Sequence, residues 1–220
     1  MRRFELVIFD CDGVLVDSEL ITNRVFAALL AELGLPLTLE FMFEHFVGRS
    51  MQHCWEQVGR MLGKDVPAHW QRELQLRAAA ALAAEVQAVQ GIEAVLDVLD
   101  VPYCVASSGS HEKMATTLAA TGLLPRFRGR IFSAADVARG KPAPDIFLHA
   151  AASCGVRPAV CAVIEDSPAG VAAGVAAGMT VYGYSACTLE RRLLEAGAHY
   201  IFNNMAKLPA LLFGPYTESG

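Results

Sequence analysis

Two aspartates, Asp10 and Asp12, stand at the end of a short apolar run near the start of the chain, in the segment FDCDGVLVDSE. The run before them, residues 4–9, predicts a buried strand, and a carboxylate placed there is costly to remove from water. Gly13 follows directly and permits the tight turn that would bring the two carboxylates near each other. This placement indicates a chemical role for the pair.

Three further apolar runs end in polar residues that could join the two aspartates. In chain order these are Ser107 and Ser108 after the run 103–107, Lys141 after the run 129–137, and Glu165 and Asp166 after the run 160–164. Ligands of open α/β sheets bind at the carboxyl ends of the strands. We therefore expect one end of one sheet to gather all of these side chains.

Each of these residue types suits one part of a phosphoryl transfer. Four carboxylates gathered together repel one another unless a cation lies among them, and Mg²⁺ prefers carboxylates combined with water and substrate phosphate. The hydroxyl of Ser107, the neighbouring backbone N–H groups and the ammonium of Lys141 are donors that match a phosphoryl group. A carboxylate in contact with both metal and phosphorus can attack it to form an aspartyl-phosphate, and a second carboxylate can donate and accept the proton.

The elements that must position these residues follow a regular alternation. Each short apolar run is followed by a helical pattern, and this order predicts an α/β fold, in which a Rossmann-like parallel sheet carries helices on both faces. The predicted strands lie within 4–9, 101–110, 129–137, 159–167, 178–186 and 199–204.

One segment interrupts the alternation, because residues 18–88 show helical patterns and no convincing strand. Thr38 precedes an apolar turn and is a predicted N-cap. We expect a helical subdomain at 18–86 inserted into an α/β core of 1–17 and 87–220. The predicted helices of this subdomain are 20–33, 39–46, 51–62 and 69–85.

The composition of the whole chain excludes several functions. The 220 residues carry a net charge of −5 and no basic run, so we expect no nucleic-acid partner. The apolar N-terminal run is too short for a signal peptide or a membrane span, and we expect a cytoplasmic protein without a membrane partner. No coiled-coil seam appears, which favours a monomer. The cysteines show no zinc spacing and are expected to be reduced, at positions 11, 54, 104, 154, 161 and 187.

Four motifs, in order along nearly the whole chain, resemble those of the haloacid-dehalogenase-like (HAD) superfamily: FDCDGVLVDSE, VASSGS, GKPAPDIF and VIEDSPAGVAAGVAAG. The resemblance implies that Asp10 is the nucleophile and a metal ligand. Asp12 would be the acid and base and would offer its backbone carbonyl to Mg²⁺. The inserted helices would match the cap of that superfamily, which closes over the site.

The same resemblance assigns the other residues of the four motifs. Ser107 and Lys141, with Ser108 beside them, would hold the phosphoryl group. Asp166 would bind the metal, and Glu165 would be either a second ligand or a partner of the ligands. Dehalogenases of the superfamily lack the second aspartate, so Asp12 argues against dehalogenation.

Within the superfamily, the chain looks closest to the branch of β-phosphoglucomutase and the sugar-phosphate phosphatases, including those acting on 6-phosphogluconate. The mutases carry a histidine where this chain has Thr22 and an arginine where it has Met51 after the cap glycine Gly48. We therefore expect a Mg²⁺-dependent phosphatase for a small phosphorylated metabolite. A phosphomutase is the alternative, and a non-catalytic metabolite-binding protein is a minor one. Arg49 is either a contact for the distal negative charge of the substrate or a solvated side chain.

Overall fold

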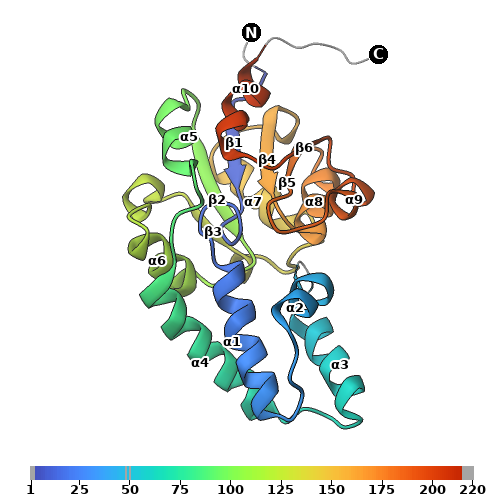
Figure 1. Cartoon of the computed structure of the whole chain (residues 1–220). Coiled ribbons are helices and arrows are strands. Elements are labelled where there is room, and N and C mark those ends of the chain that lie inside the picture. The colour runs from blue at the N-terminus through green and yellow to red at the C-terminus, as the bar shows by residue number, and fades with distance from the viewer. Residues whose placement is uncertain (1–2, 48, 50, 215–220) are drawn as a thin grey trace.

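Six parallel strands form the centre of the computed structural model, which describes residues 3–47, 49 and 51–214 (Figure 1). The sheet order is β3-β2-β1-β4-β5-β6, so the predicted α/β class is confirmed. The strands are β1 (Leu6–Phe9), β2 (Tyr103–Ser107), β3 (Ile131–Ser133), β4 (Cys161–Glu165), β5 (Thr180–Tyr184) and β6 (Tyr200–Phe202).

The central strand β1 is buried on both faces, which explains its unbroken apolar sequence. Leu6 and Ile8 belong to a core cluster with α7, α8 and α9, whereas Val7 and Phe9 belong to the cluster on the other face with α5, α6 and α10. These helices are α5 (Ile92–Val98), α6 (His111–Ala120), α7 (Asp145–Ser153), α8 (Pro168–Ala176), α9 (Glu190–Glu195) and α10 (Leu208–Phe213).

The chain order reverses at β1, which pairs with β2 on one side and with β4 on the other. Phe9 lies opposite Val105 of β2 and Ile164 of β4, so the three strands end side by side. Ligands of doubly wound sheets bind at such a reversal point, outside the carboxyl ends of the strands. The residues that follow β1, β2 and β4 are therefore brought to one place.

Four helices lie beyond the carboxyl ends of the strands, between β1 and α5 in sequence (Figure 1). They enclose a separate apolar cluster that includes Phe26, Met42 and Trp55. The predicted N-cap is confirmed, because the Thr38 hydroxyl accepts a hydrogen bond from the Phe41 backbone N–H at 3.2 Å. The helices are α1 (Glu19–Glu32), α2 (Leu39–His45), α3 (Met51–Leu62) and α4 (Ala68–Glu85).

The two connections between these helices and the sheet run side by side. Val16 forms an antiparallel bridge with Ala88, and the Val89 N–H donates to the Leu15 carbonyl at 3.0 Å. Because the two crossings are hydrogen-bonded to each other, the four helices join the rest of the chain through one paired connection.

The structure differs from the sequence-based expectation in two elements. The strand expected within 129–137 spans only Ile131–Ser133, because Ser133 caps a short 3-10 helix that turns the chain away. Helix α5 was not predicted, although its apolar residues lie at helical spacing. The 3-10 helices are η1 (Leu124–Phe127), η2 (Ala134–Asp136), η3 (Pro158–Val160) and η4 (Met205–Lys207). Gly48 lies outside the described residues, and none of the described helices has the length and apolar character to cross a membrane.

Candidate active site

Lys141 joins two of the predicted acidic residues at the carboxyl end of the sheet. Its Nζ donates to Asp10 Oδ1 at 2.7 Å, to Glu165 Oε1 at 2.6 Å and to the Ala106 carbonyl at 3.0 Å. The ammonium side chain is 4% exposed, and the Glu165 side chain is fully buried. All three protons of the ammonium therefore have acceptors, which buried charges need.

The second oxygen of Glu165 is also engaged. Glu165 Oε2 accepts hydrogen bonds from the backbone N–H and the hydroxyl of Ser167, both at 2.9 Å. Gly170 of α8 makes room for this carboxylate, since a Cβ at that position would overlap it. Glu165 is thus fixed from both sides by Lys141 and by the start of α8.

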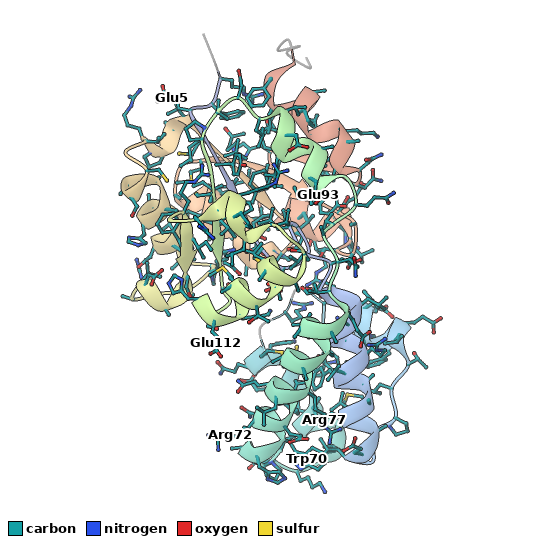
Figure 2. The ribbon with its side chains drawn as sticks, turned by 90° about the vertical axis from the view of Figure 1, so that its left-hand side faces the viewer. Glu5, Trp70, Arg72, Arg77, Glu93 and Glu112 are labelled. Atoms are coloured by element: carbon teal, nitrogen blue, oxygen red, sulfur yellow. The ribbon has the colours of Figure 1, made fainter. Side chains whose placement is uncertain are left out.

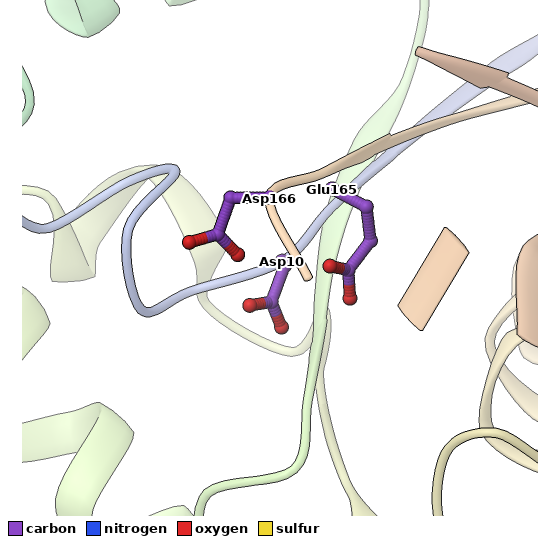
Figure 3. A group of neighbouring side chains, drawn as sticks. All are labelled: Asp10, Glu165 and Asp166. Carbon is purple, nitrogen blue, oxygen red and sulfur yellow. The ribbon is translucent and has the colours of Figure 1, made fainter. Parts of the chain in front are cut away.

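Asp10, Glu165 and Asp166 form a compact group of carboxylates (Figure 3). One oxygen of each lies within 4.8 Å of the others, and all three residues are buried. Burial raises the pKa of Asp10 to about 7, against the opposing charge of Lys141. Burial and the charge of Glu165 raise the pKa of Asp166 well above its usual value. The group has the oxygen donors and the excess negative charge that suit a hard divalent cation such as Mg²⁺.

Asp12 lies apart from this group and faces a different set of donors. Its Oδ1 accepts from the Ser18 hydroxyl and its Oδ2 from Lys113 Nζ, both at 2.7 Å. Gly13, with φ of +75°, forms the turn after Asp12, and a Cβ there would overlap the Asp166 carboxylate. The glycine therefore serves both the turn and the close approach of Asp166.

The two predicted phosphate-binding serines differ in their surroundings. Ser107 is buried, and its hydroxyl accepts from the Gly109 N–H at 3.1 Å, whereas Ser108 is exposed. The Ser133 hydroxyl donates to the Gly109 carbonyl at 2.7 Å and fixes the turn from β3. Two hydrogen bonds therefore hold the turn that follows β2, with Ser108 at its surface.

A cleft of about 1570 Å³ opens beside the site. Its walls come from α3 and α4 on one side and from the first turns of α6 on the other, where Glu112 is labelled in Figure 2. Thr22 and Lys113 line it, so the cleft reaches the residue that holds Asp12.

Arg49 lies on the connection between α2 and α3 and is exposed. It is near Arg192 of α9, because burial and then the charge of Arg49 lower the pKa of Arg192. Arg192 Nη1 also donates to the Val47 carbonyl at 2.9 Å, which links α9 to the same connection. Arg49 therefore lies where the connection between α2 and α3 meets α9.

Sequence reasoning missed the two partners of Asp12. Ser18 lies six residues away, and its hydroxyl at the start of α1 was a signal that could have been used. Lys113 lies 101 residues from Asp12 and occupies the first turn of α6. Its contribution depends on how α6 docks beside β1, which no local pattern in the sequence indicates.

The comparisons with known proteins agree with this geometry. Residues 4–178 match the family model of haloacid dehalogenase-like hydrolases, and the chain belongs to that family. The 6-phosphogluconate phosphatase of Escherichia coli (strain K12) is 33% identical over 215 residues, which cover 96% of each chain. The prediction of an enzyme is therefore confirmed. The chain belongs to a family of hydrolases, and its relatives include phosphatases.

Two solved structures share the whole architecture. A haloacid dehalogenase-like protein of unknown function from Agrobacterium tumefaciens is 38% identical with a TM-score of 0.89, over 95% of this chain and 97% of the other. A HAD family hydrolase from Deinococcus radiodurans, solved with bound phosphate and sodium, is 32% identical with a TM-score of 0.83, over 98% and 100%.

Proposed function

We propose that this protein is a Mg²⁺-dependent phosphatase that hydrolyses a small phosphorylated metabolite through an aspartyl-phosphate. The observation that carries the proposal is the group of Asp10, Glu165 and Asp166 with Lys141 among them at the end of β1. The Deinococcus radiodurans relative was solved with bound phosphate and sodium, which supports binding of an anion and a cation by this fold.

Asp10 and Asp166 are the carboxylates that would hold Mg²⁺, together with the backbone carbonyl of Asp12. Glu165 belongs to the same acidic group, but both of its oxygens already accept hydrogen bonds. We therefore assign it mainly to fixing Lys141 and the start of α8. Bound Mg²⁺ would neutralise charge on the phosphoryl oxygens and on the carboxylates around it.

In the first step, Asp10 attacks phosphorus and the bond to the leaving oxygen breaks. Asp12 donates a proton to that oxygen, while the turn of Ser107 and Ser108 binds the phosphoryl oxygens. Lys141 exchanges its hydrogen bond to Asp10 for one to a phosphoryl oxygen and keeps its bonds to Glu165 and the Ala106 carbonyl. In the second step, water attacks the aspartyl-phosphate and Asp12 accepts its proton. Residues 18–86 act as a cap over a core of 1–17 and 87–220 and exclude bulk water during the transfer.

A direct test uses p-nitrophenyl phosphate as substrate in the presence of Mg²⁺. Asp10→Asn should abolish phosphate release, and EDTA should abolish the activity of the wild-type protein. Lys207→Met, an exposed change in η4, is the matched control and should leave the rate unchanged. Full activity in Asp10→Asn would refute the assignment of Asp10 as the nucleophile.

For the substrate, we propose a sugar-derived phosphate such as 6-phosphogluconate, the compound named for the Escherichia coli relative. Its carboxylate lies at the end remote from the phosphate, where Arg49 could bind it. Arg49→Met should raise KM for 6-phosphogluconate by about tenfold, the worth of one charge-assisted hydrogen bond. Glucitol 6-phosphate lacks the carboxylate and should be unaffected, so an equal effect on both compounds would reject this contact.

A further incubation distinguishes a phosphatase from a phosphomutase, which transfers the phosphoryl group back to a sugar. Incubation with β-glucose 1-phosphate and a bisphosphate primer should release free glucose and inorganic phosphate. Accumulation of glucose 6-phosphate would instead identify a mutase. No turnover across a panel of phosphorylated metabolites with Mg²⁺ would identify a binding protein without catalysis.

A further inference from the structure

Lys113 lies near the site but belongs to none of the four sequence motifs. It is the third residue of α6, and its backbone N–H donates to the Ser110 hydroxyl that caps the helix. Because the first turn of α6 is fixed in this way, the Lys113 side chain extends from a defined point toward the turn after β1. Its Nζ lies 2.7 Å from Asp12 Oδ2.

The two oxygens of Asp12 are held by donors from different elements. Ser18, which precedes α1, holds Oδ1, and Lys113 holds Oδ2, both at 2.7 Å. Each of these oxygens accepts one hydrogen bond and keeps a second lone pair for the transferred proton. A carboxylate held through both oxygens therefore keeps one orientation while it donates and accepts that proton. Both hydrogen bonds are charge-assisted, and the one from Lys113 also pairs two opposite charges.

Lys113 is more exposed than the other lysine of the site and borders a cleft. Its side chain is 39% exposed and lines the cleft between α6 and the helices α3 and α4. Lys141, by contrast, is 4% exposed and faces Asp10 and Glu165. Because Lys113 both lines this cleft and binds Asp12, we assign the cleft to the part of the substrate that leaves with the departing oxygen.

We propose that Lys113 is a positioning residue for departure of the leaving group, acting through Asp12. This inference rests on the proposed function, in which Asp12 is the proton donor. As the phosphorus–oxygen bond breaks, its electron pair stays on the leaving oxygen and the Asp12 proton moves to that oxygen. The negative charge that Asp12 acquires is then met by the Lys113 ammonium, already in hydrogen-bonding position. In the second step the same contact holds the Asp12 carboxylate toward the attacking water.

The test compares two substrates of similar shape whose leaving groups differ in basicity. p-Nitrophenolate leaves without a proton, whereas the alkoxide of benzyl phosphate needs one. Since kcat/KM covers the steps up to release of the alcohol, it reports proton donation. Lys113→Met should lower kcat/KM for benzyl phosphate by about 10- to 100-fold and for p-nitrophenyl phosphate by less than about threefold.

Three further variants make the result decisive. Lys113→Arg keeps the positive charge and should recover part of the benzyl phosphate activity, and Lys207→Met should equal the wild type with both substrates. Asp12→Asn should show the same discrimination between the substrates as Lys113→Met. Thermal unfolding of each variant checks that it is folded.

Equal losses on the two substrates in Lys113→Met, or no loss on either, would overturn the positioning role. If Asp12→Asn still discriminates in that event, the proposed function of Asp12 survives and only the role of Lys113 fails. If Asp12→Asn does not discriminate, Asp12 is not the proton donor, and both the proposed acid and the inference about Lys113 are wrong.

Discussion

Replacing Lys141 with methionine tests the charge balance at the end of β1. The change removes a 4% exposed ammonium and leaves Asp10 and Glu165 buried without their shared cation. Removing one partner of a buried ion pair costs about 3–5 kcal/mol of unfolding free energy. With a urea dependence of about 2 kcal/mol per molar, the unfolding midpoint should fall by about 1.5–2.5 M.

The loss of stability should grow with pH. Burial raises the pKa of Asp10 to about 7 against the opposing charge of Lys141, and without Lys141 this pKa rises further. The folded variant then holds more protons than the folded wild-type protein around and above pH 7, so its unfolding free energy falls more steeply as pH rises. We expect a larger difference between the two proteins at pH 8 than at pH 6.

The assay is urea unfolding followed by circular dichroism at both pH values, with EDTA present so that added cations do not replace the ammonium. Lys207→Met is again the matched control, and its exposed side chain should change the unfolding free energy by less than about 0.5 kcal/mol. A Lys141→Met protein with the wild-type midpoint at pH 8 would refute the reasoning that this ammonium compensates the buried carboxylates.

Three other measurements examine separate parts of the site and its support. Mg²⁺ should raise the melting temperature of the wild-type protein in proportion to the logarithm of its concentration, and Asp166→Asn should weaken that rise. Gly13→Ala should lower kcat/KM at least about tenfold by displacing Asp166, whereas Gly34→Ala, at φ of +88° with open space around it, should only cost stability of about 1 kcal/mol. A backbone hydrogen bond and then His111 lower the pKa of Asp136 from its usual 3.8, so Asp136→Asn should cost about 1 kcal/mol at pH 7. That difference should vanish as the pH falls below the lowered pKa, because the wild-type carboxylate is then also neutral.

The sheet could be predicted from the sequence because each strand is a short apolar run with a polar turn behind it. The run that became β1 is buried on both faces, so its composition alone marks a central strand. The strand within 129–137 is shorter than its run, since the apolar residues continue into η2, where Ser133 and Asp136 form a capping box. Helix α5 is seven residues long and follows Gly91 at φ of +88°, so it offered a short signal beside a turn.

For the candidate site too, the sequence predicts some of the contacts and misses others. Asp10, Glu165 and Asp166 could be placed together because parallel strands must end at a common edge, and the structure brings them within 4.8 Å. The contacts of Lys113 and Arg192 depend instead on how a helix docks after the sheet has formed. Lys113 contacts a residue 101 positions away in the sequence, and Arg192 contacts one 145 positions away. No local spacing in the sequence predicts either contact.

Asp10 and Asp12, which follow β1, are paired with different lysines and lie in different environments. Lys141 binds Asp10 inside the protein, where the side chains are 4% and 10% exposed. Lys113, which lines the cleft, binds Asp12, and these side chains are 39% and 22% exposed. A buried carboxylate beside two others suits metal binding and attack on phosphorus, since water is kept away from it. The proposed role of Asp12 requires a more exposed carboxylate, which can exchange protons with water. The different burial of two aspartates only two residues apart is therefore the physical basis for giving them different roles.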